Sequence, residues 1–127
     1  MTKKLPNELI NAWQEREGPL VLVTVSENGT PNAIYASIVK IIADGRIAVA
    51  DNYFDKTKSN IDTGNCKVSA LFITTGHKSY QVKGSIEYHT EGALFEDMLT
   101  WADPKHPRKG VAIINCEEVY RGKERLA

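Results

Sequence analysis

Two tight-turn signals between apolar runs constrain the fold more than any other feature of this sequence. Asn28-Gly29 and Asp44-Gly45 favour short hairpins, because Gly, Asn and Asp tolerate positive φ angles. The flanking apolar runs span residues 20–25, 32–42 and 46–51. Strands joined by such turns must run antiparallel, since a parallel connection needs a crossover of about a dozen residues. The first half of the chain therefore predicts an antiparallel meander and not a βαβ unit.

The second half adds three predicted strands and completes a set of three predicted helices. The strand at 79–89 has the clearest pattern, because its even positions are mainly apolar and its odd positions are polar. The other two strands are expected at 67–75 and 110–120, and the helices at 5–18, 56–63 and 91–103. Gly18-Pro19 should end the first helix, and residues 121–127 are expected to form a polar tail.

Six mostly hairpin-connected strands with flanking helices predict a mainly β fold. A small closed antiparallel barrel suits this pattern, because closure removes the exposed edges of an open six-stranded sheet. The chain of 127 residues is long enough for one core but not for two. We therefore expect a single domain over residues 1–127.

The strands at 20–25 and 32–42 have apolar residues on both faces. In strict alternation, the second strand would have one face made of Ile34, Ala36, Ile38 and Ile42, and an opposite face made of Ala33, Tyr35, Val39 and Ile41. A barrel interior buries only one face of a strand. Either helices or a second copy of the chain must cover the other, and we expect a homodimer.

Composition excludes several classes of partner. Lys plus Arg and Asp plus Glu number 16 each, so no net charge favours nucleic acid or an anionic membrane. No apolar run reaches the ~20 residues that span a bilayer, and the N-terminus lacks a signal-peptide pattern. Cys66 and Cys116 are too few for a disulfide framework and have no metal-ligand spacing. We expect a cytoplasmic protein with reduced thiols and no metal site.

An anion site is predicted where the strand at 46–51 leads into the helix at 56–63. Unpaired backbone N–H groups and the positive end of the helix dipole favour anions at a helix N-terminus. Lys56, Thr57 and Asn60 add a cation, a hydroxyl and an amide there, which are the groups that a phosphate needs. A solvated helix start is the alternative interpretation of this lysine-rich segment.

The order and spacing of these segments resemble the FMN-binding split-barrel proteins related to pyridoxamine 5′-phosphate oxidase. The resemblance covers nearly the whole chain. It depends on Leu22-Val23-Thr24-Val25, Asn28-Gly29-Thr30-Pro31, Ile38-Val39-Lys40, Arg46-Ile47-Ala48-Val49-Ala50, Lys56-Thr57-Lys58-Ser59-Asn60-Ile61, Val82-Lys83-Gly84 and Glu117-Glu118-Val119-Tyr120. It implies a six-stranded Greek-key split β-barrel and a homodimer with two FMN sites at its interface.

The resemblance also assigns the phosphate end of such a site. Lys56 and Thr57 match the family's phosphate contacts, and Asn60 matches less closely. Lys40 occupies the position of a second-strand lysine that helps to bind phosphate in the oxidases. A lysine that extends from the strand end into water is the alternative for Lys40.

The flavin end is assigned in the same way. Ala36 and Ser37 fall where the second strand of the family runs beside the flavin. Asp51, Asn52 and Tyr53 fall near the ribityl chain and the ring.

Several aromatic and histidine residues remain open between a site and a structural role. Trp101 lies before the break at Pro104 and could reach a flavin across a dimer interface, although such aromatics more often belong to a core. His77, His89 and His106 have no metal-type spacing and are interpreted as surface residues. No residue pair stands out as a general acid and base.

Departures from the oxidases limit the functional hypothesis. The oxidases are longer, have Arg-Lys where this chain has Lys56-Thr57, and contain C-terminal substrate residues that this chain lacks. We therefore expect FMN binding without the vitamin B6 oxidase activity. The leading hypothesis is an oxidoreductase that uses FMN and a partner such as NAD(P)H, with an unknown substrate. The alternatives are a non-catalytic FMN carrier or store, or a barrel that binds haem or the deazaflavin F420.

Overall fold

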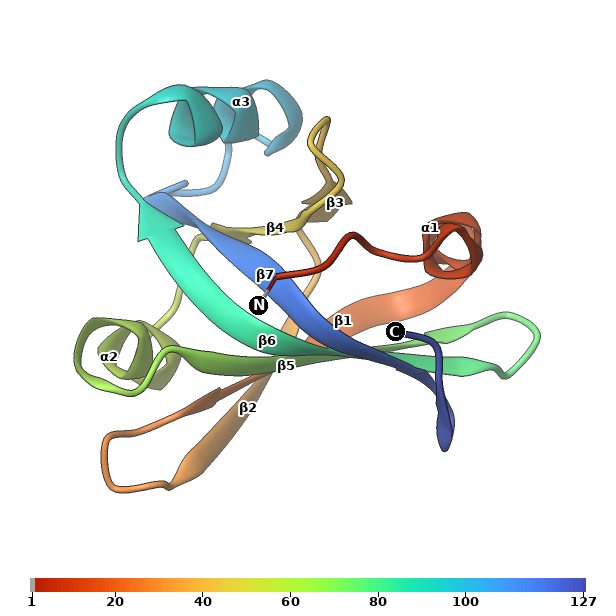
Figure 1. Cartoon of the computed structure of the whole chain (residues 1–127). Helices are drawn as coiled ribbons and strands as arrows, with labels where there is room; N and C mark the ends of the chain where they lie inside the picture. The colour runs from red at the N-terminus through yellow and green to blue at the C-terminus, as the bar shows by residue number, and fades with distance from the viewer. Residues whose placement is uncertain (1) are drawn as a thin grey trace.

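Both predicted hairpins are present and belong to one antiparallel sheet. The computed structural model describes residues 2–127 (Figure 1). Its helices are α1 (Asn7–Trp13), α2 (Lys56–Thr63) and α3 (Ala93–Trp101). Its strands are β1 (Arg16–Val25), β2 (Pro31–Ala36), β3 (Val39–Ile41), β4 (Ile47–Asp51), β5 (Lys67–Thr74), β6 (Ser79–His89), β7 (Gly110–Arg121) and β8 (Glu124–Arg125).

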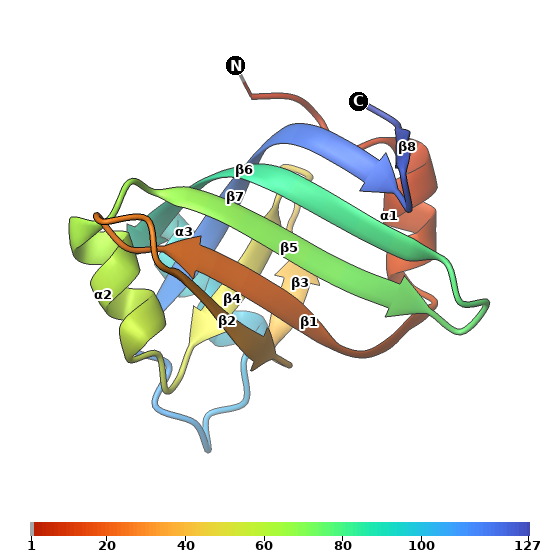
Figure 2. The same ribbon diagram turned by 90° about the horizontal axis from the view of Figure 1, so that it is seen from below.

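The sheet closes into a barrel because its two outermost strands are one bent segment of chain. The strand order is β2-β1-β5-β6-β7-β4-β3, with β8 paired to β7. β2 and β3 lie at opposite ends of this order, yet only residues 37 and 38 separate them. The short connection brings the two sheet edges together, as Figure 2 shows from below the view of Figure 1. The fold is therefore the mainly β split barrel expected from the sequence, with eight strands in place of six.

The break between β2 and β3 reverses which side chains face the barrel interior. Ile34, Ala36, Val39 and Ile41 all pack in the barrel core, whereas Ile38 packs outside it. The prediction that strict alternation continues through residues 32–42 was therefore wrong. The backbone bends at residues 37–38, and a change of one residue in register transfers every following side chain to the other face.

The first helix and the C-terminal tail also differ from the predictions. α1 ends at Trp13 and β1 begins at Arg16, so Gly18-Pro19 lies within the strand. Pairing with β5, for example Arg16 with Thr74, overrides the local helix signal. The predicted polar tail turns back to form β8, and Leu126 and Ala127 pack against the core.

Two apolar clusters explain why β4 and β7 are buried on both faces. The first cluster fills the barrel interior and includes Leu9 of α1. The second lies outside β4 and β7 and is covered by Met98 of α3 and by Ala102, the residue that follows this helix. Figures 1 and 2 show α3 over these strands, with α1 and α2 at opposite ends of the barrel.

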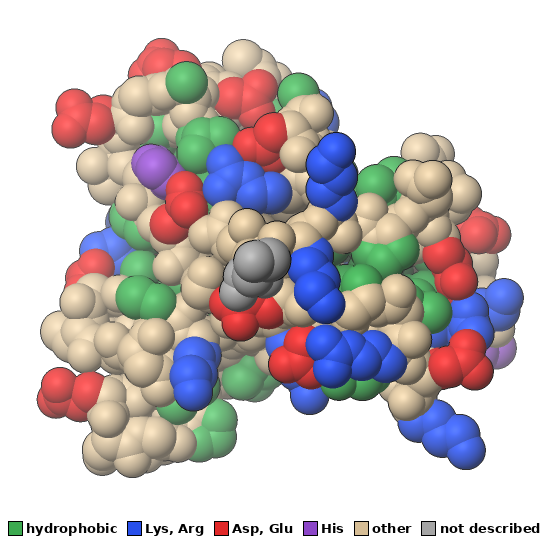
Figure 3. Space-filling view, viewed as in Figure 1, with side chains coloured by type: hydrophobic (Ala, Val, Ile, Leu, Met, Phe, Trp, Pro, Cys, Tyr) green, Lys and Arg blue, Asp and Glu red, His purple; other side chains and the backbone are tan. Residues whose placement is uncertain are grey.

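The surface agrees with the balanced composition. On the face shown in Figure 3, basic and acidic side chains lie interspersed, without a large field of one sign. Within residues 2–127, no helix is long and apolar enough to cross a membrane. The same residues contain no group of three or more His, Cys, Asp or Glu side chains arranged to hold a metal ion.

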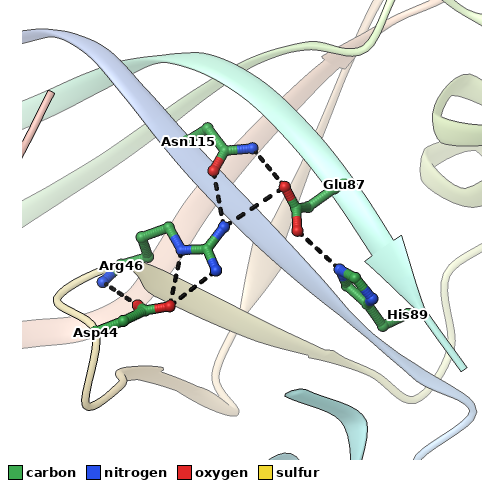
Figure 4. A network of polar contacts seen from close by, with 5 residues as sticks. All are labelled: Asp44, Arg46, Glu87, His89 and Asn115. Atoms are coloured by element: carbon green, nitrogen blue, oxygen red, sulfur yellow. Dashed lines mark hydrogen bonds and ion pairs between the residues drawn. The ribbon is translucent and has the colours of Figure 1, made fainter. Parts of the chain in front are cut away.

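A polar network ties the start of β4 to β6 and β7 (Figure 4). Arg46 donates from Nη1 to Asn115 Oδ1 at 2.9 Å and forms an ion pair with Asp44 at 2.8 Å. Asn115 Nδ2 donates to Glu87 Oε2 at 2.8 Å, and His89 Nε2 lies 2.8 Å from Glu87 Oε1. The hydrogen bond from Asn115 is the main cause that lowers the pKa of Glu87, with smaller effects of His89 and Arg46.

This network predicts acid-sensitive stability at Glu87. A carboxyl with a lowered folded-state pKa binds fewer protons in the folded than in the unfolded chain. Its contribution is therefore present above the ordinary pKa of 4.5 and is lost as the pH falls below it. We expect Glu87→Gln to lower the free energy of unfolding at neutral pH, by an amount that shrinks below pH 4.5. Denaturant titrations at several pH values test this. Glu27→Gln, at an exposed hairpin position, is the control, and a Glu87→Gln effect as independent of pH as the control would contradict the prediction.

Candidate functional site

Helix α2 buries two of its polar side chains, Thr57 and Asn60, against the barrel. Thr57 and Asn60 are 1% and 8% exposed. Asn32 Nδ2 of β2 donates to Thr57 Oγ1 at 3.3 Å, and Asn60 Nδ2 donates to Thr24 Oγ1 of β1 at 3.1 Å. These bonds fasten the helix across the end of the barrel. Thr57, expected at the phosphate, is therefore a buried anchor of α2.

The two lysines at the start of α2 face different surroundings. Lys58 forms an ion pair with Asp62 at 2.8 Å, and its Nζ lies 4.7 Å from the ring centroid of Tyr88 on β6. The Lys56 side chain is 78% exposed, and its nearest acid, Asp55, is 3.9 Å away. Of these two lysines, Lys56 therefore has the charge that is more accessible to a ligand.

A small hollow of about 220 Å³ lies between α2 and the β1–β2 hairpin, and we call it the helix hollow. Its lining residues are Ser26, Thr30, Pro31, Asn32, Lys56, Ser59 and Asn60. The hydroxyls of Ser26 and Thr30 both donate to Asn28 Oδ1. Lys56 and Ser59 offer an ammonium and a hydroxyl to an anion there, beside the Asn32 and Asn60 amides, each of which has one N–H already engaged. The hairpin residues were not predicted as part of the site, because their approach to α2 is a tertiary contact.

A second hollow of about 430 Å³ lies beside the break between β2 and β3, and we call it the strand hollow. It is lined by residues 34–38 on β2 and the following connection, by residues 50 and 52–54 at and after the end of β4, and by His106. Most of the lining is apolar or aromatic. Four predicted flavin residues line it together: Ala36, Ser37, Asn52 and Tyr53.

His106 reaches the strand hollow because the α3–β7 loop is fastened to the end of β4. Arg108 N–H donates to Asn52 Oδ1 at 3.0 Å, and Lys109 N–H donates to the Asp51 carbonyl at 2.8 Å. Figure 2 shows this loop beside the connection from β4 to α2. The His106 ring lies edge-on to Tyr53, with centroids 6.1 Å apart. The interpretation of His106 as a plain surface residue was incomplete, and only its position between Pro104 and Pro107 distinguished it in the sequence.

Asp51 lies beneath the strand hollow and has a structural role. It is 1% exposed, and both carboxylate oxygens accept hydrogen bonds, one from Phe54 N–H at 2.9 Å and one from Tyr88 Oη at 2.5 Å. Burial is the main cause that raises the pKa of Tyr88, and the bond to Asp51 adds to it. Asp51 thus shapes the turn that forms the wall and presents no free oxygen to a ligand.

Two predicted site residues lie away from both hollows. Lys40 is exposed on β3 and pairs with Ala48. Trp101, on α3, donates from Nε1 to Asp97 Oδ2 at 3.3 Å and packs against the second apolar cluster. Neither lines the helix hollow or the strand hollow.

The two hollows lie along the same strand and follow one another in order. β2 contributes residues 31 and 32 to the helix hollow and residues 34–36 to the strand hollow. Asn32 and Ala36 are separated by about 13 Å at the usual rise of a strand. The arrangement suits an elongated ligand with an anionic group at one end and a flat apolar body at the other.

Comparison with known proteins identifies the family of the chain. The sequence model described as pyridoxamine 5′-phosphate oxidase matches residues 7–121. The uncharacterized protein MJ0282 of Methanocaldococcus jannaschii is 30% identical over 128 residues, which is 97% of this chain and 78% of that protein.

Solved structures share the fold over most of their length. HupZ of Group A Streptococcus has a TM-score of 0.79 at 24% identity, covering 92% of this chain and 93% of its own. An FMN-binding protein from Syntrophomonas wolfei has a TM-score of 0.74 at 18% identity, covering 92% and 82%. HutZ, the heme storage protein from Vibrio cholerae, has a TM-score of 0.67 at 17% identity, covering 94% and 95%.

Proposed function

Because the chain belongs to the family of pyridoxamine 5′-phosphate oxidase-related proteins, we propose that it binds FMN along β2. The observation that supports this most directly is the pairing of the two hollows. One end offers the Lys56 ammonium and the Ser59 hydroxyl to a phosphate, with the Asn60 side chain beside them. The other end offers the flat, mostly apolar walls that an isoalloxazine ring needs.

Each residue of this chain has a defined part in the proposed site. Ala36, Ser37, Asn52 and Tyr53 would contact the ring or the ribityl chain. Thr57 and Asp51 would act without touching the ligand: Thr57 holds α2 in place, and Asp51 holds the turn over residues 51–54. Lys40 and Trp101 line neither hollow and are not part of the proposal for this chain.

We further propose that the protein is a cytoplasmic oxidoreductase that accepts electrons from NAD(P)H. Bound FMN would supply the redox chemistry, and the chain would bind it, orient it and exclude water from one side. The free thiols of Cys66 and Cys116 suit a reducing compartment. The alternative is a non-catalytic FMN carrier or store. Anaerobic mixing with NADH or NADPH separates the two, because rapid bleaching of the flavin supports the oxidoreductase and no bleaching supports the carrier.

An uncovered apolar row on the barrel wall supports a homodimer. Val21 of β1 pairs with Tyr35 of β2 on one side and with Leu71 of β5 on the other. Tyr35 is 77% and Leu71 is 39% exposed. Tyr35 also lines the strand hollow, so a second copy on this row would enclose the ring end of the site.

Haem is a second candidate ligand because of His106. Among the three histidines, only His106 lines the strand hollow, where an imidazole could ligate iron. The fold shared with the heme storage protein HutZ also supports it. The absorbance spectrum of the purified protein distinguishes a flavin from a haem.

We predict that Lys56→Ala weakens FMN binding by about 1.5–3 kcal/mol, the scale of one charge-assisted hydrogen bond. Isothermal titration calorimetry with FMN measures this. Lys123→Ala, an exposed lysine in the β7–β8 turn, is the matched control and should leave the dissociation constant unchanged. Equal dissociation constants for Lys56→Ala and the unmodified protein would place the phosphate elsewhere.

We predict that the protein is a dimer in solution, with a mass twice the chain mass of 14.1 kDa. We expect Leu71→Glu to convert it to a monomer. A carboxylate in the apolar row would lose its hydration on association without gaining a partner. Sedimentation equilibrium gives the mass, with Lys123→Glu as the control. A dimeric Leu71→Glu variant would show that this row is not the interface.

A further inference from the structure

A tyrosine–carboxylate pair links β6 to the end of β4, with Asp51 buried and Tyr88 half-buried. Tyr88 Oη donates to Asp51 Oδ2 at 2.5 Å, across the interior from β6 to the end of β4. The pair needs Gly110 on β7, because a Cβ at that position would overlap the Tyr88 side chain. Neither hollow is lined by Tyr88 or Asp51, so these residues have no direct contact with a ligand bound there.

Asp51 fixes the wall of the strand hollow. Its other carboxylate oxygen accepts the Phe54 N–H at 2.9 Å, which closes the turn over residues 51–54. Its backbone carbonyl accepts the Lys109 N–H at 2.8 Å, which holds the loop that contains His106. The position of the Asp51 side chain therefore determines the positions of residues 52–54 at the ring end.

Tyr88 also contacts the helix that forms the other hollow. Lys58 Nζ lies 4.7 Å from the Tyr88 ring centroid and forms an ion pair with Asp62 one turn further along α2. Lys56 and Ser59 project from the same helix into the helix hollow. One side chain thus touches both the turn that forms the ring wall and the helix that presents the anion donors.

We propose that Tyr88 and Asp51 are positioning residues that set the spacing between the two hollows. Their link holds α2 and the 51–54 turn in the relative placement that lets one ligand fill both ends at once. This inference rests on the proposed FMN binding, and it goes beyond it by assigning a role to two residues that do not touch the ligand.

The test compares FMN with riboflavin, which has the same ring system but no phosphate. If the link sets the spacing, Tyr88→Phe should weaken FMN binding roughly tenfold, the scale of one lost hydrogen bond. Loosening of the 51–54 turn should weaken the binding of both ligands alike, whereas only FMN also needs the fixed spacing between the two ends. The ratio of the riboflavin to the FMN dissociation constant should therefore fall severalfold. A general loss of stability would not change this ratio.

Tyr120→Phe is a closely matched control. Tyr120 Oη donates to the Glu118 carboxylate at 2.7 Å, and Lys83 Nζ lies 5.0 Å from the Tyr120 ring centroid. Tyr120 therefore has the same two kinds of contact as Tyr88, a carboxylate at its hydroxyl and a lysine over its ring. The control should leave the ratio unchanged. An unchanged ratio in Tyr88→Phe, or an equal fall in Tyr120→Phe, would overturn the proposal.

A ligand-free measurement separates this inference from the proposed function. Tyr88→Phe should accelerate hydrogen exchange at the Phe54 amide, measured by NMR, because the Asp51 carboxylate loses its second anchor. Unchanged exchange at Phe54 would overturn the positioning role even if FMN binds. Failure of the unmodified protein to bind FMN and riboflavin would overturn the proposed function and the spacing role together, and accelerated exchange would then establish only the structural link.

Discussion

The fold depends on one local constraint, the bend at residues 37–38 that separates β2 from β3. A continuous strand would have kept both segments in one part of the sheet. The bend instead places them at its two ends and reverses the alternation, so that Ala36 and Val39 both face the interior. Closure follows from this connection without any further strand pairing. The strand hollow opens at the same place, because the backbone there leaves the hydrogen-bonded ladder.

The end of the barrel next to this opening is closed by polar bonds and not by apolar packing alone. Helix α2 is anchored by Asn32, Thr24 and Tyr88, which belong to three different strands. Buried polar groups of this kind are costly when unpaired and specify one geometry when paired. The anchors fix the rotation of α2 about its axis. That rotation leaves Lys56 and Ser59 on the open side and turns Thr57 and Lys58 away from it.

The sequence was sufficient to predict the helices, strands and turns that depend on local chemistry. The Asn-Gly and Asp-Gly turns, the alternation at 79–89 and the short helix at 56–63 gave the fold class and most strands. Alternation could not reveal the bend at 37–38, because both faces of that segment are apolar. The first helix was extended too far because the pairing of Arg16 with Thr74, a partner far along the chain, decides its end. Tertiary pairing overrides local propensity in both cases.

The same distinction applies to the site. Residue type identified the neighbourhood, and four predicted residues do meet in one hollow. Residue type could not show which of these side chains face a ligand and which pack against the protein. Lys56 and Lys58 are indistinguishable by sequence, yet one faces solvent and the other packs on Tyr88, 30 positions away. Asp51 resembles a ligand contact until both of its oxygens are found to be occupied.

A barrel of this kind does not by itself select a ligand, since one fold supports many activities. Selection of a ligand depends on how charge is distributed between the two hollows. The helix hollow concentrates its free donors within a few residues of α2, whereas the strand hollow is lined mainly by apolar groups. This asymmetry suits a ligand with one compact anionic end and one flat end. A ligand with charge spread along its length would leave part of that charge against apolar walls, where an unpaired anion is strongly disfavoured. The specificity proposed here therefore depends on the separation of the two hollows along β2 as well as on the residues that line them.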